Sequence, residues 1–291
     1  MTRAITVGVD GSAESLAAAD WAAREAALRD APLRVVHAWP RETADVTVTQ
    51  DRDERAAAAD GVLREAVTRV TGRHPHLAVS SEVVADTAVA ALLKEAERSE
   101  ALVLGTRGHG ALVGFLLGSY GQQVIADATG PVVSVRAGTG TGSEDTPGEV
   151  VVGQHGEPED ADDPVLRFAF EAAAARGATV RAVRAWTLPP LYAYSPGSLH
   201  LADEAGGLEP YERQALARAL APWRERFPDV PVVEHVEIGS AGQVLLSALA
   251  DARLLVVGRT ARRSPIGTRI GSVAHAALHH AGCPVAVVPH A

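Results

Sequence analysis

Three glycines and a serine follow a predicted buried strand at a spacing that suits phosphate binding. The run Ala101–Leu104 leads into Gly105-x2-Gly108-x9-Gly118-Ser119, where a helical stretch begins. Glycine lets the backbone approach a ligand closely and adopt positive φ. A helix N-terminus offers unpaired N–H groups and a partial positive charge, and a serine hydroxyl there can cap the helix or contact a phosphate. A glycine pair alone would more simply turn the chain, but the longer pattern indicates an anion site that fits a polyphosphate.

An aspartate near the N-terminus is the second candidate for chemistry. Asp10 ends the first predicted strand, in the run ITVGVDG (Ile5–Gly11). Its carboxylate could cap the helix that follows. A role in ligand binding is about equally compatible with the sequence, and the two roles can coexist.

Residues able to catalyse a reaction are few. The one lysine, Lys94, lies in a helical stretch, so the loop G-x-x-x-x-G-K-[ST] is absent and Schiff-base chemistry is disfavoured. Only Asp10 and His109 stand where a general base for the glycine loop could lie. Efficient phosphoryl transfer normally needs a group that positions water and groups that stabilise charge. We therefore expect a binding module and no efficient enzyme.

Two other candidates have simpler interpretations. His275 and His279 stand four residues apart, a spacing compatible with metal binding, but no third ligand is evident nearby. We interpret them as part of an exposed helix face and predict no metal site there. Cys283 precedes Pro284 at the entrance of a predicted strand, where we expect it to behave as a small buried hydrophobic residue.

Composition excludes several classes of protein. The chain has 291 residues, of which 47% are hydrophobic, and a formal net charge of −9. This balance argues against nucleic acid as a partner, because duplex binding needs a dense basic patch. A single cysteine cannot form an intramolecular disulfide, and no run approaches the roughly 20 apolar residues of a membrane span. We expect a cytoplasmic protein that binds neither nucleic acid nor a membrane.

The elements that position these candidates occur twice along the chain. Matched positions at one constant offset are Gly105 with Gly258, Gly118–Ser119 with Gly271–Ser272, and Pro131 with Pro284. Upstream, ITVGVDG matches VVVGQHG (Val150–Gly156), and VVHAW (Val35–Trp39) matches AVRAW (Ala182–Trp186). A stretch rich in glycine, serine and threonine separates the copies. We predict domain 1 over residues 1–138, a linker over 139–148 and domain 2 over 149–291.

Within each copy, runs rich in valine, isoleucine and leucine alternate with helical stretches. This pattern is typical of parallel strands whose two faces are covered by helices. We therefore predict an α/β protein with two tandem doubly wound, Rossmann-like domains, each with a five-stranded parallel sheet. The strands expected in the first copy are Ile5–Val9, Leu33–Trp39, His76–Val84, Ala101–Gly105 and Pro131–Arg136. The second copy repeats the order and ends with the strand Pro284–Val288.

The pattern G-x2-G-x9-G-[ST] after the fourth strand, with an aspartate ending the first, resembles the universal stress protein family in its tandem, two-domain form. The segments HAW, GPVVSVR and CPVAVVP also resemble family sequence, and the match covers nearly the whole chain. The resemblance implies an adenine nucleotide α-hydrolase-like fold, ATP as the ligand and a divalent metal, Mg²⁺, on its phosphates.

The resemblance also implies roles for individual residues of the first domain. The adenine and ribose would be faced by Gly8, Asp10 and Ala38. The loop would be lined by Gly105, Gly108 and Gly110, and the phosphates held by Gly118, Ser119 and the Tyr120 amide. Thr106, Arg107 and His109 lie between these positions and could reach the phosphates with their side chains.

The second copy departs from the pattern in two places. His155 stands at the position of Asp10, and it lacks the two acceptor oxygens of a carboxylate. Ala261 stands at the position of the middle glycine, where its methyl group disfavours positive φ. Nearby arginines could neutralise phosphates in compensation, so the sequence leaves nucleotide binding here open. The candidate residues are Gly153, His155, Gly258, Arg259, Thr260, Ala261, Arg262, Arg263, Gly271, Ser272 and Val273.

By this resemblance, ATP occupancy rather than product formation would signal energy or stress status to a downstream protein partner of unknown identity. Two alternatives stay open: a slow ATP hydrolase, and a protein-interaction scaffold whose nucleotide pockets are vestigial. We expect the terminal strands Pro131–Arg136 and Pro284–Val288 to be sheet edges through which two chains form a homodimer.

Overall fold

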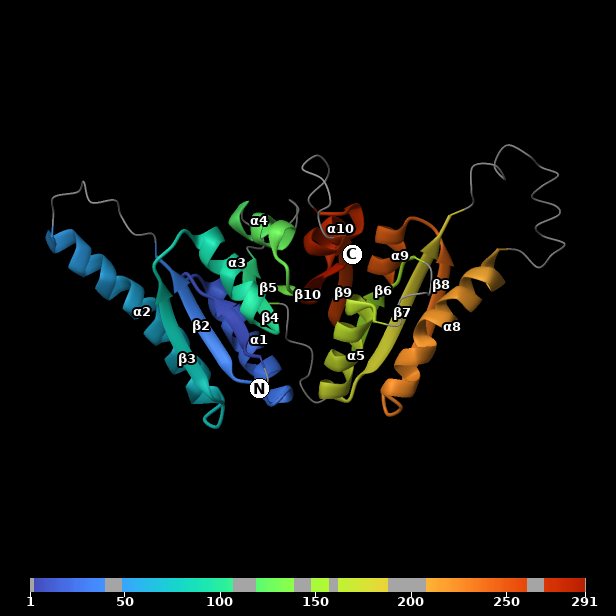
Figure 1. Ribbon diagram of the computed structural model, residues 1–291, viewed down its shortest axis with the longest axis horizontal. Coiled ribbons are helices and arrows are strands. Elements are labelled where there is room, and N and C mark those ends of the chain that lie inside the picture. The colour runs from blue at the N-terminus through green and yellow to red at the C-terminus, as the bar shows by residue number, and fades with distance from the viewer. Residues whose placement is uncertain are drawn as a thin grey trace.

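The computed structural model describes residues 3–39, 49–106, 119–138, 148–156, 162–187, 208–260 and 270–290. Its strands form one ten-stranded sheet in the order β3-β2-β1-β4-β5-β10-β9-β6-β7-β8. Figure 1 shows the two halves of the chain on either side of β5 and β10, which lie side by side at the centre. All strand pairs within each half are parallel, which confirms the predicted α/β class and its parallel sheets.

The first half alternates strands and helices in the predicted order. Its elements are β1 (Ile5–Gly8), α1 (Ala13–Leu28), β2 (Leu33–Ala38), α2 (Thr49–Arg73), β3 (Val79–Val84), α3 (Ala88–Arg98), β4 (Ala101–Thr106), α4 (Ser119–Asp127) and β5 (Val132–Arg136). The chain moves outward from β1 to β3 and then returns to place β4 on the other side of β1. The strand order therefore reverses between β1 and β4, the place where ligands bind in open α/β sheets.

The second half repeats this arrangement. Its elements are β6 (Glu149–Gly153), α5 (Pro164–Arg176), β7 (Thr179–Trp186), α8 (Glu209–Arg226), β8 (Val232–Ile238), α9 (Ala241–Ser247), β9 (Ala252–Thr260), α10 (Ser272–His280) and β10 (Val285–His290). Here the strand order reverses between β6 and β9. None of the helices in the described ranges is both long and apolar enough to cross a lipid bilayer.

Local sequence explains where the first helix of each half begins and ends. The Ser12 hydroxyl caps α1 by accepting a hydrogen bond from the Ser15 amide, and Asp163 caps α5 with Pro164 in its first turn. Both helices are followed by a residue with left-handed backbone, Asp30 with φ 49° and Gly177 with φ 60°. A left-handed residue ends a helix because it directs the chain away from the helix axis.

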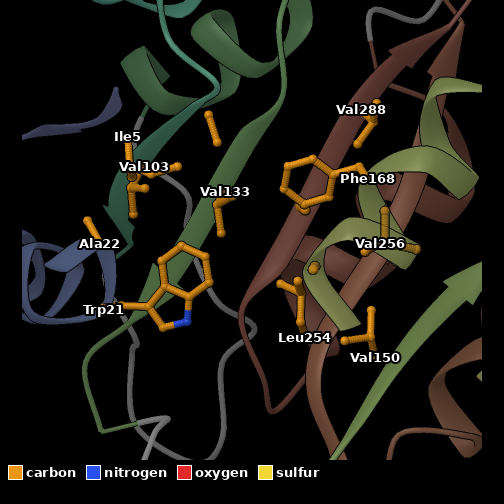
Figure 2. Packing of buried hydrophobic residues seen from close by; sticks show 14 of the residues in the cluster. Ile5, Trp21, Ala22, Val103, Val133, Val150, Phe168, Leu254, Val256 and Val288 are labelled. Carbon is orange, nitrogen blue, oxygen red and sulfur yellow. The ribbon is translucent and has the colours of Figure 1, made fainter. Parts of the chain in front are cut away.

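The hydrophobic core forms one cluster on each face of the sheet. Successive residues of a strand point to opposite faces, so Val103 joins the cluster under α1 and α5 while Leu102 and Leu104 join the cluster under α4 and α10. Both clusters contain residues from both halves. Figure 2 shows Trp21 of α1 and Phe168 of α5 pointing towards the middle of the molecule from opposite sides. The two halves thus share their core.

The expectation that the terminal strands are free sheet edges is wrong. β5 and β10 pair with each other in antiparallel register, with Val285 opposite Ser134 and Val287 opposite Val132. A homodimer through these strands would have to displace a pairing that the chain makes within itself. The physical reason is that linking the copies in one chain places each terminal strand at high effective concentration beside the other. The edges of the sheet are β3 and β8 instead.

Candidate functional site

The candidate site lies at the carboxyl ends of β1 and β4. These strands are neighbours, with Gly8 opposite Leu104 in the register. The register therefore brings Asp10, which follows β1, close to Gly105 and Thr106, which end β4. Residues about 95 positions apart in the chain meet because the strand order reverses at this point.

Asp10 is held in a turn that leads into α1. Its Oδ1 accepts hydrogen bonds from the Ser12 backbone N–H at 3.0 Å and from the Ser12 hydroxyl at 2.5 Å. Gly11 lies between them with φ 81°, a conformation that favours glycine. The helix cap is therefore Ser12, and Asp10 supports that cap in place of forming it. Asp10 is also exposed to solvent.

Gly105 is required by a close approach of α1 to the end of β4. A Cβ atom added at this position would lie 2.5 Å from the carbonyl carbon and oxygen of Glu14 and 2.7 Å from the backbone nitrogen of Ser15. No rotamer change can relieve such a contact, because the neighbouring atoms belong to the backbone. Gly105 therefore allows the first turn of α1 to pack against the strand from which the glycine loop departs.

Thr106 does not have the role that the sequence suggests. Its side chain is buried, and its hydroxyl donates a hydrogen bond to the Val135 carbonyl of β5 at 3.3 Å. The expectation that this side chain reaches a phosphate is wrong, because its hydroxyl is bonded to the neighbouring strand β5 and is not directed to solvent. Its hydroxyl helps to join β4 to β5 instead.

Helix α4 begins at Ser119, at the position where the glycine pattern predicts a helix start. Ser119 and Tyr120 are both exposed, while Val124 and Ile125 anchor the other end of the helix in the core. The first two residues of α4 are therefore on the surface, and a helix N-terminus carries backbone N–H groups and a partial positive charge. The loop residues Arg107, Gly108, His109, Gly110 and Gly118 lie outside the described residues.

The end of β2 completes this edge of the sheet. Ala38, predicted to face the adenine, is the last residue of β2 and is partly exposed. Beside it, the His37 Nδ1 lies 2.8 Å from the Val9 carbonyl oxygen and ties β2 to the end of β1. His37 is not among the predicted site residues, although its place in the repeated segments VVHAW and AVRAW is a signal for it.

The second half offers the same backbone with different side chains. Gly153 ends β6, the exposed His155 follows it, and Gly156 has φ 97°, matching Gly11 of the first half. Helix α10 begins at Ser272 as α4 begins at Ser119. Gly271, Ser272 and Thr260 are exposed and Val273 is partly exposed. A Cβ at Gly258 would meet His290 at 2.8 Å and Val165 at 3.2 Å.

Arg259 is turned away from the second site. Its guanidinium donates a hydrogen bond to the Ala128 carbonyl at the end of α4, in the first half, and the residue is only 5% exposed. The expectation that Arg259 neutralises phosphates is therefore wrong. Arg136 makes the reciprocal bond, donating to the Ala281 carbonyl at the end of α10 at 2.7 Å. Ala261, Arg262 and Arg263 lie outside the part of the chain that the structure describes.

The histidine and cysteine candidates lie apart from these sites. The rings of His275 and His279 stack on α10 with centroids 4.2 Å apart. Within the described ranges, no three histidine, cysteine, aspartate or glutamate side chains come together as a metal site. Burial raises the pKa of the Cys283 thiol to about 11, so the thiol stays protonated near neutral pH.

The fold defines a class of protein: a tandem α/β chain in which the strand order reverses once in each half and the helix that follows the fourth strand of each half begins at a serine. A solved universal stress protein from Archaeoglobus fulgidus has this architecture, with a TM-score of 0.71 at 16% sequence identity, covering 99% of this chain and 98% of that chain. At this identity the likeness concerns the fold alone.

Sequence comparison is more specific. The model of the universal stress protein family matches residues 1–136 and again residues 149–289. A universal stress protein of Mycolicibacterium smegmatis is 35% identical over 295 residues, covering 98% of this chain and 96% of the relative. Universal stress protein Rv2005c of Mycobacterium tuberculosis is also 35% identical, over 294 residues, covering 97% of this chain and 96% of the relative. The chain therefore belongs to the universal stress protein family and carries its domain twice, as the sequence motifs predict.

Proposed function

We propose that the first half binds ATP with Mg²⁺ on its phosphates, and that occupancy of this site is the signal the protein transmits. One observation carries the proposal: an anchored, exposed carboxylate and an exposed helix N-terminus stand at the same carboxyl edge of the sheet, at the reversal of strand order. This arrangement offers an acceptor for a sugar or a metal and donors for phosphate.

The two parts suit the two ends of a nucleotide. The backbone N–H groups at the start of α4 would hold the phosphates, helped by the Ser119 hydroxyl. Asp10 would bind a ribose hydroxyl or Mg²⁺, which is commonly held in proteins by one or two carboxylates together with substrate phosphates. The Asp10 carboxylate fits either role because Ser12 fixes its position while the residue stays exposed.

A role in binding suits these side chains better than efficient catalysis. Rapid phosphoryl transfer needs a group that positions water and charges that stabilise the transition state. The Thr106 hydroxyl is buried against β5, which removes one group that could position water beside the phosphates. We propose that any hydrolysis is slow and that the bound state acts on an unidentified downstream protein. Nucleotide can shift the protein between conformations only if it binds them with different affinity.

Thermal unfolding with and without MgATP tests the proposal. A ligand at one hundred times its dissociation constant stabilises a protein by about 2.7 kcal/mol, so wild type should melt at a clearly higher temperature. Gly118→Val places a branched side chain in the glycine pattern and should remove the effect. Gly271→Val, at the matched position of the second half, is the control and should keep it. A wild-type protein that MgATP does not stabilise would contradict the proposal and favour a scaffold with vestigial pockets.

A further inference from the structure

Building on the proposed function, we infer that the chain binds one nucleotide, in its first half, because Arg184 closes the equivalent site of the second half. Arg184 takes the place of His37 in the repeated segments AVRAW and VVHAW. The surrounding backbone is the same in both halves: the Val9 amide donates to the Val36 carbonyl at 2.9 Å, and the Gln154 amide donates to the Val183 carbonyl at 2.9 Å.

The two side chains differ in what they hold. His37 contacts one carbonyl, that of Val9, at the end of β1. Arg184 donates through Nη1 to the Gln154 side-chain oxygen at 2.6 Å and to the Gly156 carbonyl at 2.9 Å. Its Nε donates to the Glu212 carboxylate of α8 at 2.6 Å. Arg184 therefore ties the turn after β6 to both β7 and α8.

This attachment is difficult to release. The Arg184 side chain is only 13% exposed and Gln154 is buried. If the arginine swung out, Gln154 would lose a buried partner and Glu212 would lose its ion pair, which leaves polar groups poorly satisfied. The turn that must accept a ribose is thus held by the protein's own guanidinium, which is already paired and is not offered to a phosphate.

Two neighbouring residues of the second half also disfavour nucleotide binding there. His155 replaces the carboxylate that Asp10 offers in the first half, so the second turn lacks the two charged acceptor oxygens that suit a ribose or Mg²⁺. At the adjacent tip of β9, the guanidinium of Arg259 is buried against the Ala128 carbonyl of the first half. The second half therefore keeps the backbone of a nucleotide site while its side chains serve internal contacts.

Isothermal titration with MgATP counts the sites. Wild type should bind one nucleotide per chain, Gly118→Val should bind none, and Gly271→Val should still bind one. A wild-type stoichiometry of two, or one site remaining in Gly118→Val, would overturn the inference.

A matched pair of variants isolates Arg184. The variant His155→Asp with Ala261→Gly restores the family residues but keeps the arginine, and it should bind no more nucleotide than wild type. Adding Arg184→His should create one further site per chain, whatever the wild-type number. The inference fails if the double and the triple variant both gain the site, or if neither gains it. This comparison does not depend on whether the first half binds ATP. Should the triple variant unfold, Glu212→Gln can be added to it, because this removes the carboxylate left without its arginine.

Discussion

Arg29 of the first half and Arg176 of the second both pair with the Glu25 carboxylate, which is 2% exposed. Each arginine also lies over an aromatic ring of the opposite half: Arg29 is 5.1 Å from the Phe168 centroid and Arg176 is 5.9 Å from that of Trp21. Two matched contacts thus cross between the halves around one shared acid. Together with β5 and β10, this cluster makes the tandem repeat a single folded unit.

The first prediction follows from this cluster. Glu25→Gln should lower the free energy of unfolding by about 3–5 kcal/mol, because it leaves the largely buried Arg176 without its partner charge and leaves Arg29 with Glu100 alone. Urea denaturation followed by circular dichroism measures the change. Glu97→Gln, at an exposed position of α3, is the control and should change stability by less than about 0.5 kcal/mol. Equal effects of the two substitutions would show that the buried pairs contribute nothing to stability.

The second prediction concerns Gly105. Gly105→Ala should destabilise the protein by about 1–3 kcal/mol, since its Cβ would collide with the backbone of Glu14 and Ser15. It should also weaken MgATP binding by displacing α1 from the end of β4. Gly61→Ala in α2 is a matched control, because a Cβ there meets nothing within 4 Å. In a helix interior this change should stabilise by about 0.5–1 kcal/mol. Thermal melts measure the stability of both variants. An unchanged melting temperature for Gly105→Ala would contradict the packing argument.

The third prediction separates binding from helix capping. Ser12→Ala should cost about 1 kcal/mol of stability through loss of the α1 cap. Because the Ser12 backbone N–H still donates to the Asp10 carboxylate, MgATP affinity should change only modestly. Asp10→Asn keeps an acceptor oxygen for Ser12 but loses the charge, so it should weaken the Mg²⁺-dependent part of ATP affinity with little loss of stability. Titrations with and without EDTA measure that part. If Asp10→Asn bound MgATP like wild type, the charge of Asp10 would have no part in holding Mg²⁺.

The fourth prediction concerns pH. Burial raises the pKa of Cys283 from 9.0 to about 11 in the folded state. Because the folded state holds this proton longer than the unfolded chain, the free energy of unfolding should fall as the pH rises through this interval. Cys283→Ala should lack this part of the pH dependence. The difference between the free energies of unfolding of the two proteins therefore isolates the contribution of the thiol. At pH 8 the native thiol should react with Ellman's reagent far more slowly than the thiol of protein unfolded in urea. Equal reaction rates would show that the thiol is not protected.

Much of the fold could be predicted because its signals are local. Strands such as β1 and β4 are continuous apolar runs, and the α1 cap at Ser12 depends on residues a few positions away. The start of α4 at Ser119 likewise follows from the glycine pattern that precedes it. Duplication made the second half predictable from the first, since the same spacing of glycines recurs there.

The site was only partly predictable, because the direction of a side chain depends on what packs beside it. Asp10 and Gly105 lie at the reversal of strand order, as predicted. The Thr106 hydroxyl, however, donates to a carbonyl of β5, and the Arg259 guanidinium donates to a carbonyl of the other half. Arg184 looked unremarkable in the sequence, since its partners Gln154 and Glu212 lie some 30 positions away and on different elements.

The amino-acid sequence by itself determined the repeated α/β units, their order of elements and the family to which they belong, because periodicity and motif spacing are properties of neighbouring residues. Only the tertiary structure decided that β5 pairs with β10, that Glu25 joins Arg29 to Arg176, and that Arg184 holds the turn at Gly156. Each of these contacts brings together segments that are distant in the chain. These contacts form because, once the halves pack together, apolar side chains become buried and buried charges need partners. A pattern of neighbouring residues contains no information on either effect.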